Sequence, residues 1–309
     1  MAKYRVLSID GGGLRGLVTT VLLQRIVATA GLENLLNSID LIAGTSTGGL
    51  LALGMAKGLD LSELRDVYVK KGRKIFDDTW LDDLADLGKL RGADYGTKGL
   101  RRELRRLFGK TTLGELGKRV LIPAFDLDNE EPERRSWKPK LFHNFEGPEN
   151  DSASLAVDVG LYTSAAPTYF PSVDGYIDGG VYAGNPAMCG LAQTQDPRYD
   201  PTPSLDEVLL LSLGTGTSLQ YIKGKSHDWG YAQWARPLIS LMLDGTAGIA
   251  DYQCRQMLRE RYHRLAPVFP VGVSVPMDDI SKIPYMVQFA ETLPIEDTIN
   301  WLLQTWNAA

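Results

Sequence analysis

The segment GTSTGG, residues 44–49, carries the residue best suited to covalent chemistry, Ser46. It has the pattern Gly-x-Ser-x-Gly, in which the serine occupies a tight turn between a strand and a helix and exposes its hydroxyl group. Gly44 and Gly48 flank Ser46 because larger side chains there would collide with the neighbouring strand and helix. The helix that follows directs its N-terminal N–H groups toward the serine, which favours negative charge there. The pattern therefore predicts Ser46 as a nucleophile.

A nucleophilic serine also needs hydrogen-bond donors for the oxyanion that forms during attack on a carbonyl group. The segment SIDGGGLRG, residues 8–16, offers the backbone N–H groups of Gly11, Gly12 and Gly13 without side chains that would block a substrate. The same segment fits the Gly-x-Gly-x-x-Gly fingerprint of dinucleotide-binding proteins. That interpretation is weak, because Asp10 adds a carboxylate where the pyrophosphate would lie and the strand DLIAG ends in the serine turn rather than in an acidic residue.

Serine activation requires a base, which is usually histidine. The chain has three histidines, and none lies in a glycine-rich turn. The sequence places His143 on a strand with a polar face, His227 in a loop and His263 near the end of a basic helix.

An acidic residue offers an alternative base. The segment DGYIDGG, residues 174–180, contains Asp178 followed by Gly179 and Gly180, which leave its carboxylate free to approach another backbone. Asp178 is therefore a candidate base, although the same residues also fit the start of a turn. The preceding pair, Asp174 and Gly175, predicts a hairpin turn.

Strands and helices must alternate to position these residues. Apolar stretches predict strands at 4–9, 40–44, 119–127 and 207–214, while helical periodicity covers 17–30, with Gly31 as its cap, and 61–75. This order predicts an α/β fold with a mostly parallel sheet covered on both faces. The glycine loop and the serine turn lie one β-α-β unit apart, so we expect both at the carboxyl edge of that sheet.

Composition excludes several classes of protein. With 44% hydrophobic and 23% charged residues in 309, the chain resembles globular domains rather than disordered or fibrous proteins. Its net charge of −5 gives no general attraction to nucleic acid, and its two cysteines exclude a disulfide framework. The N-terminal segment lacks the features of a secretory signal, so we expect a cytoplasmic protein.

Three motifs in order, DGGGLRG at 10–16, GTSTGG at 44–49 and DGG at 178–180, resemble those of the patatin-like phospholipases. TSAAPTYFP at 163–171, GNPA at 184–187 and LSLGTG at 211–216 also resemble segments of that family, so the similarity extends over about residues 4–217. It implies a three-layer α/β/α sandwich and one domain over 1–309, with 218–309 as its helical C-terminal part.

The resemblance further implies a lipid acyl hydrolase of the phospholipase A type that forms an acyl-serine intermediate. Ser46 would be the nucleophile, Asp178 the base and Gly11–Gly13 the oxyanion loop, with no metal or cofactor. Arg15 would support the loop or an anionic head group, or form an ion pair with Asp10. Gly179 and Gly180 complete the motif around the base.

The sequence leaves two alternatives open. An esterase or thioesterase would use Ser46 with an aspartate and either His227 or His263, and a lipid-binding effector would have a silent site. Phospholipid substrates imply transient contact with a membrane surface. The amphipathic segments 99–110 and 295–306 fit either such a contact or a stripe that closes the core.

Overall fold

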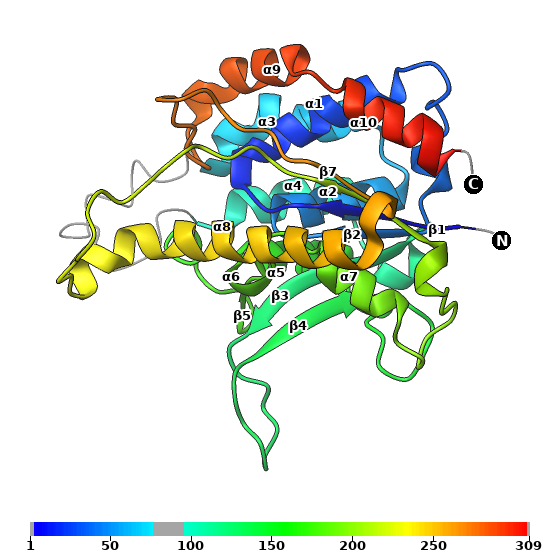
Figure 1. Ribbon diagram of the computed structural model, residues 1–309. Helices are drawn as coiled ribbons and strands as arrows, with labels where there is room; N and C mark the ends of the chain where they lie inside the picture. The colour runs from blue at the N-terminus through cyan, green and yellow to red at the C-terminus, as the bar shows by residue number, and fades with distance from the viewer. Residues whose placement is uncertain (1–2, 77–95, 308–309) are drawn as a thin grey trace.

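A computed structural model describes residues 3–76 and 96–307 (Figure 1). Its sheet has the order β4-β3-β2-β1-β6-β7, with β5 paired to β3 outside this path. The strands are β1 (Tyr4–Ile9), β2 (Leu41–Gly44), β3 (Arg119–Asp126), β4 (Lys138–His143), β5 (Tyr176–Asp178), β6 (Val208–Leu213) and β7 (Tyr262–Leu265). Adjacent strands from β3 to β7 along the path are parallel, whereas β4 and β5 run antiparallel to β3.

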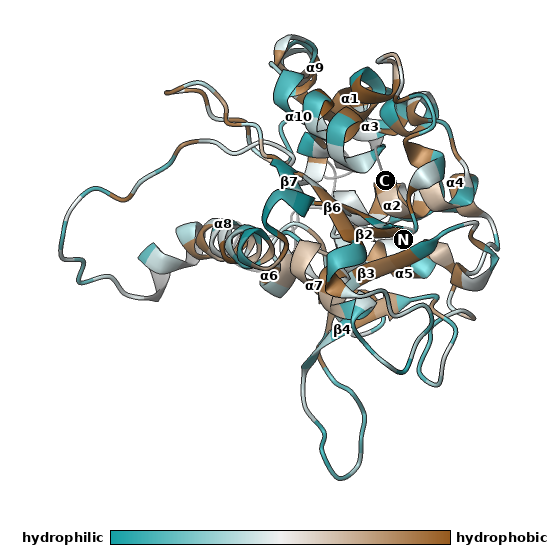
Figure 2. Cartoon of the chain, turned by 45° about the vertical axis from the view of Figure 1, so that its right-hand side comes forward, coloured by the Kyte–Doolittle hydropathy of each residue, from teal (hydrophilic) through white to brown (hydrophobic). Residues whose placement is uncertain are grey.

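Helices cover both faces of the sheet. One face carries α1 (Gly16–Val27), α2 (Thr47–Lys57), α3 (Leu61–Phe76), α4 (Lys98–Phe108), α5 (Ala156–Ser164), α9 (Ile283–Thr292) and α10 (Glu296–Trp301). The other carries α6 (Gly180–Ala183), α7 (Ala187–Thr194) and α8 (Tyr231–Leu258). Figure 2 shows hydrophobic central strands between these helices. The expected three-layer α/β/α fold is confirmed.

The strands are buried on both faces, which explains their nearly continuous apolar sequences. In β1, Leu7 and Ile9 face the larger hydrophobic core, while Tyr4 and Val6 face the smaller core under α7 and α8. In β6, Leu209, Leu211 and Leu213 face the larger core, whereas Val208 and Leu210 face the smaller one. The strands predicted at 4–9, 40–44, 119–127 and 207–214 all form. Successive side chains of each strand point to opposite faces of the sheet, and both faces are buried.

Several local predictions need correction. Helix α1 ends at Val27 rather than at residue 30, and Gly31 adopts a positive φ of 87° in the turn beyond it. The C-terminal part, 218–309, is not wholly helical, because β7 extends the parallel sheet beside β6.

The two amphipathic segments close the core rather than reach a surface. In α4, Leu100, Leu104, Leu107 and Phe108 are all buried. Near the C-terminus, Ile295, Leu302 and Trp306 are buried as well. In the described ranges, no helix combines the length and apolar character that crossing a bilayer requires.

Candidate active site

Ser46 lies in the turn between β2 and α2. Its backbone has φ 55° and ψ −124°, a conformation that residues other than glycine rarely adopt. A Cβ atom on Gly44 would lie 2.2 Å from the carbonyl oxygen of Gly48, and one on Gly48 would lie 2.2 Å from that of Ile9. The two glycines therefore permit the close strand and helix packing that holds the serine in this strained turn.

Thr163 at the end of α5 supports Ser46, a contact that the sequence did not reveal. The backbone N–H of Ser46 donates to Thr163 Oγ1 at 2.9 Å, and this hydroxyl group donates to the carbonyl oxygen of Pro123 at 2.6 Å. The hydroxyl group thus ties the serine turn to β3. Thr163 lies in the segment TSAAPTYFP, which resembles a segment of the patatin-like phospholipases. That resemblance was the one sequence feature that pointed to Thr163.

Asp178 reaches Ser46 through the short strand β5. β2 pairs with β3 up to Leu121, and β5 occupies the same edge further along, with Asp178 opposite Ala124. The end of β5 therefore lies just beyond the end of β2, where the serine turn begins. A Cβ atom on Gly179 would lie 2.3 Å from the carbonyl oxygen of Pro123, so this motif also depends on close backbone packing.

The carboxyl group of Asp178 is buried, and its Oδ1 accepts a hydrogen bond from the N–H of Gly180 at 2.7 Å. Asp178 and Ser46 line the same pocket, and Ser46 favours the charged form of this carboxyl group. Burial raises the pKa of Asp178 to about 7, because desolvation outweighs the lowering by Ser46 and by the N–H of Gly180. A carboxyl group with such a pKa exchanges protons readily near neutral pH.

The glycine loop lies against the serine turn. A Cβ atom on Gly11 would lie 3.3 Å from Ser46 Cβ. The Gly11 N–H donates to the carbonyl oxygen of Gly184 at 2.9 Å, so it is already used. The N–H groups of Gly12 and Gly13 have no acceptor in the part of the chain that the structure describes, and both residues line the pocket that contains Ser46. The oxyanion prediction therefore rests on Gly12 and Gly13.

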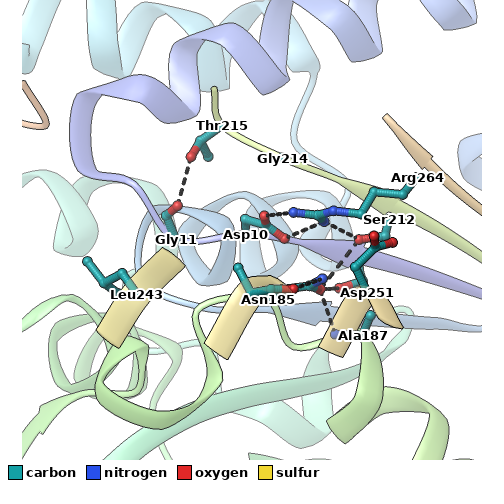
Figure 3. A network of polar contacts seen from close by, with 12 residues as sticks. Asp10, Gly11, Asn185, Ala187, Ser212, Gly214, Thr215, Leu243, Asp251 and Arg264 are labelled. Carbon is teal, nitrogen blue, oxygen red and sulfur yellow. Dashed lines mark hydrogen bonds and ion pairs between the residues drawn. The ribbon is translucent and has the colours of Figure 1, made fainter. Parts of the chain in front are cut away.

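Neighbouring segments fix the shape of this loop. Thr215 Oγ1 donates to the carbonyl oxygen of Gly11 at 2.8 Å (Figure 3). The N–H of Leu14 donates to the carbonyl oxygen of Met277 at 2.7 Å. Gly13 has φ 58° and lies so close to Met277 that a Cβ atom would be 2.4 Å from its carbonyl oxygen. Segments from the C-terminal third thus press the loop against the site.

Arg15 does not form the ion pair with Asp10 that the sequence suggested as one alternative. Asp10 instead pairs with Arg264 of β7, at 2.6 Å between Nη2 and Oδ2 (Figure 3). Arg15 Nε lies 3.4 Å from the carbonyl oxygen of Gly12, and its side chain lines a separate polar pocket behind the loop. Arg15 thus contacts the loop at the Gly12 carbonyl oxygen, and its role as a support of the loop stays a prediction.

All three histidines lie in the described part of the chain, and none lines the pocket with Ser46. His143 is the last residue of β4 and contacts the rings of Phe145 and Tyr199. His227 lies in a loop and packs on Trp229. His263 belongs to β7 rather than to a helix, and its Nε2 lies 2.9 Å from Thr298 Oγ1. The geometry gives the histidine triad no support.

The pocket itself is apolar. Asp178 is the one acidic or basic side chain among the described residues that line it. Other lining residues are Leu14, Leu50, Val67, Leu100, Phe170, Val181, Met242, Leu243 and Met277. Such a lining suits a hydrocarbon chain whose ester group lies next to Ser46.

The chain is similar in sequence to proteins of one family. The model of the family described as patatin-like phospholipase matches residues 7–189. A cGAMP-activated phospholipase of Pseudomonas aeruginosa is 32% identical over 272 residues, which cover 85% of this chain and 78% of the relative. A protein of the same description from Vibrio cholerae is 35% identical over 84% of this chain and 78% of its own. Patatin-12 of Solanum tuberosum is 30% identical over 93% of this chain and 83% of its own length.

Proposed function

Because the chain belongs to the patatin-like phospholipase family and is a lipid acyl hydrolase, we propose that it cleaves glycerophospholipid esters through Ser46 and Asp178. The observation that carries this proposal is the placement of Ser46 and the buried carboxyl group of Asp178 in one otherwise apolar pocket. No histidine is required, because the raised pKa of Asp178 makes its carboxylate a stronger base than an exposed one.

In the first half of the reaction, Asp178 accepts the hydroxyl proton as Ser46 Oγ attacks the ester carbonyl carbon. The N–H groups of Gly12 and Gly13 stabilise the oxyanion of the tetrahedral intermediate. The intermediate collapses when the bond to the alcohol oxygen breaks, and Asp178 returns its proton to that oxygen. The product is a lysophospholipid, and the fatty acyl group stays on Ser46.

In the second half, a water molecule replaces the alcohol. Asp178 takes one of its protons while the water oxygen attacks the acyl-serine carbonyl, and the same donors hold the new oxyanion. Collapse releases the fatty acid and returns the proton to Ser46 Oγ. One carboxyl group thus acts as base and acid in turn.

The test is fatty-acid release from mixed phospholipid vesicles by wild type, Ser46→Ala, Asp178→Asn and His227→Ala/His263→Ala, each shown to be folded. We expect the first two variants to lose at least 10³-fold in rate and the histidine variant to keep its activity. Loss in the histidine variant would establish the triad. Absence of release by wild type, with or without an activator, would favour the silent effector.

The relatives described as cGAMP-activated support a second element of the proposal, that a cyclic dinucleotide raises this hydrolase activity. The relevant measurement is the rate of fatty-acid release with and without cGAMP, with the linear dinucleotide as control. Equal rates in the three conditions would contradict activation while leaving the hydrolytic mechanism intact.

We also propose that the enzyme binds membrane surfaces through α8, since α4 and the C-terminal segment bury most of their apolar residues. The N-terminal part of α8 extends beyond the sheet (Figure 1). One side of the helix carries residues that are 40 to 60% exposed: Leu238, Leu241, Met242, Ile249 and Tyr252. Met242 also lines the pocket with Ser46, so this stripe continues into the site that receives the lipid.

Flotation with vesicles tests this surface. We expect Leu238→Ser/Leu241→Ser to lose vesicle binding and vesicle hydrolysis, while hydrolysis of a soluble short-chain ester stays within about twofold. Leu303→Ser is the matched control, because it removes an exposed leucine near the C-terminus. Unchanged flotation together with a shift from dimer to monomer would assign the stripe to a second copy of the chain instead.

A further inference from the structure

Asp10 occupies the position between β1 and the glycine loop, and it is the carboxylate partner of a residue far along the chain. Arg264 Nη2 donates to its Oδ2 at 2.6 Å and Nη1 donates to its Oδ1 at 3.1 Å (Figure 3). Both side chains are only 9% exposed. The contact is therefore a buried, bidentate ion pair, whose planar geometry fixes orientation as well as distance.

The sheet register explains why this arginine reaches β1. Ser8 of β1 lies opposite Ser212 of β6, and Ser212 lies opposite Arg264 of β7. Arg264 Nη1 also donates to Ser212 Oγ at 2.6 Å, so the guanidinium group lies across β6. The backbone fixes both ends of the contact. The Asp10 N–H donates to the Leu213 carbonyl oxygen at 3.0 Å, and Arg264 lies in β7, which pairs with β6.

The ion pair lies on the side of the glycine loop away from the acyl pocket. Asp10 and Arg264 line the polar pocket behind the loop, whereas neither lines the pocket with Ser46. Arg264 therefore does not touch the reacting atoms. Its influence reaches them through Asp10 and the residues that follow it.

We propose that Arg264 is a positioning residue for the oxyanion donors, an inference that rests on the proposed function of the loop. Gly11, Gly12 and Gly13 have no side chains to anchor them, so backbone contacts and the residues at either end fix their conformation. Gly184 and Thr215 hold Gly11, Met277 holds Leu14, and Arg264 holds Asp10 at the start of the loop. Without the guanidinium group, the buried carboxylate of Asp10 takes up a proton or turns toward solvent. Either change moves the N–H groups of Gly12 and Gly13 relative to Ser46.

The test measures the reactivity of Ser46 separately from fold stability. A fluorophosphonate probe labels the serine through an intermediate that needs the same oxyanion donors, and a soluble short-chain ester gives kcat and KM. We compare wild type with Arg264→Gln and with Asp10→Asn/Arg264→Gln, in which no unpaired charge is left. The matched control is Arg25→Gln, because Arg25 also joins distant segments, donating to the carbonyl oxygens of Ala290 and Leu293.

For the folded Arg264→Gln variant, we expect kcat and the labelling rate to fall about 10²-fold with KM changed less than about threefold. The double variant should recover stability but not the labelling rate, whereas Arg25→Gln should label at the wild-type rate. Wild-type labelling in either folded Arg264 variant would overturn the positioning role. Failure of wild type to label, with Ser46→Ala as reference, would instead refute the proposed function.

Discussion

Asp178→Asn is expected to stabilise the folded protein above neutral pH while it abolishes hydrolysis. Burial raises the pKa of Asp178 to about 7, against about 3.9 for an aspartate in an unfolded chain. Between these two pH values the folded protein binds one more proton than the unfolded chain, so stability falls by about 1.4 kcal/mol per pH unit. The stability that this group contributes is complete below about pH 4, and ~4 kcal/mol is lost once the pH exceeds 7.

Asparagine lacks this titration, and its side-chain oxygen can still accept the hydrogen bond from Gly180. The stability advantage of the variant over wild type should therefore grow from ~1.5 kcal/mol at pH 5 to ~4 kcal/mol at pH 8. Urea unfolding of both proteins at pH 5, 6, 7 and 8 measures it, because other titrating groups cancel in the difference. The kcat/KM of wild type should rise through the same pH range. A difference independent of pH, or a variant less stable than wild type only at pH 8, would refute the reasoning.

Three other substitutions test the packing around the site. Gly12→Ala should lower kcat at least about 10²-fold with little change in KM, because its Cβ would lie 2.2 Å from Thr215 Oγ1; undiminished turnover of a soluble ester would contradict this. Thr163→Val should lower the free energy of unfolding, measured in urea, by about 2 kcal/mol and should lower kcat about tenfold, because the Ser46 N–H and the Pro123 carbonyl lose their partner. Thr163→Ser keeps the hydroxyl group and should preserve both stability and kcat. Gly245→Ala in α8 should instead raise the free energy of unfolding by about 0.5–1 kcal/mol, because the new methyl group enters open space, and a destabilised variant would argue against that geometry.

Local sequence was sufficient where a single turn or strand determines geometry. A Cβ atom on Gly44, Gly48 or Gly179 would lie only 2.2–2.3 Å from a backbone atom. These positions require glycine, so the glycines beside Ser46 and Asp178 indicated tight turns even without the fold. The same holds for Asp174 and Gly175, which form the predicted hairpin turn, with positive φ values of 50° and 84°. Strands buried on both faces were equally recognisable, because burial selects continuous apolar runs.

The tertiary structure decided contacts that no spacing along the chain encodes. Arg264, rather than Arg15, pairs with Asp10, because the register across β1, β6 and β7 brings together residues 254 positions apart. Thr163 reaches Ser46 only because α5 ends beside β3. The apolar stripe of α4 was compatible with a membrane or a core until neighbouring helices were seen to bury it. Motifs thus predicted which groups could react, and long-range packing determined what holds those groups in place, since that packing leaves no periodic pattern in the sequence.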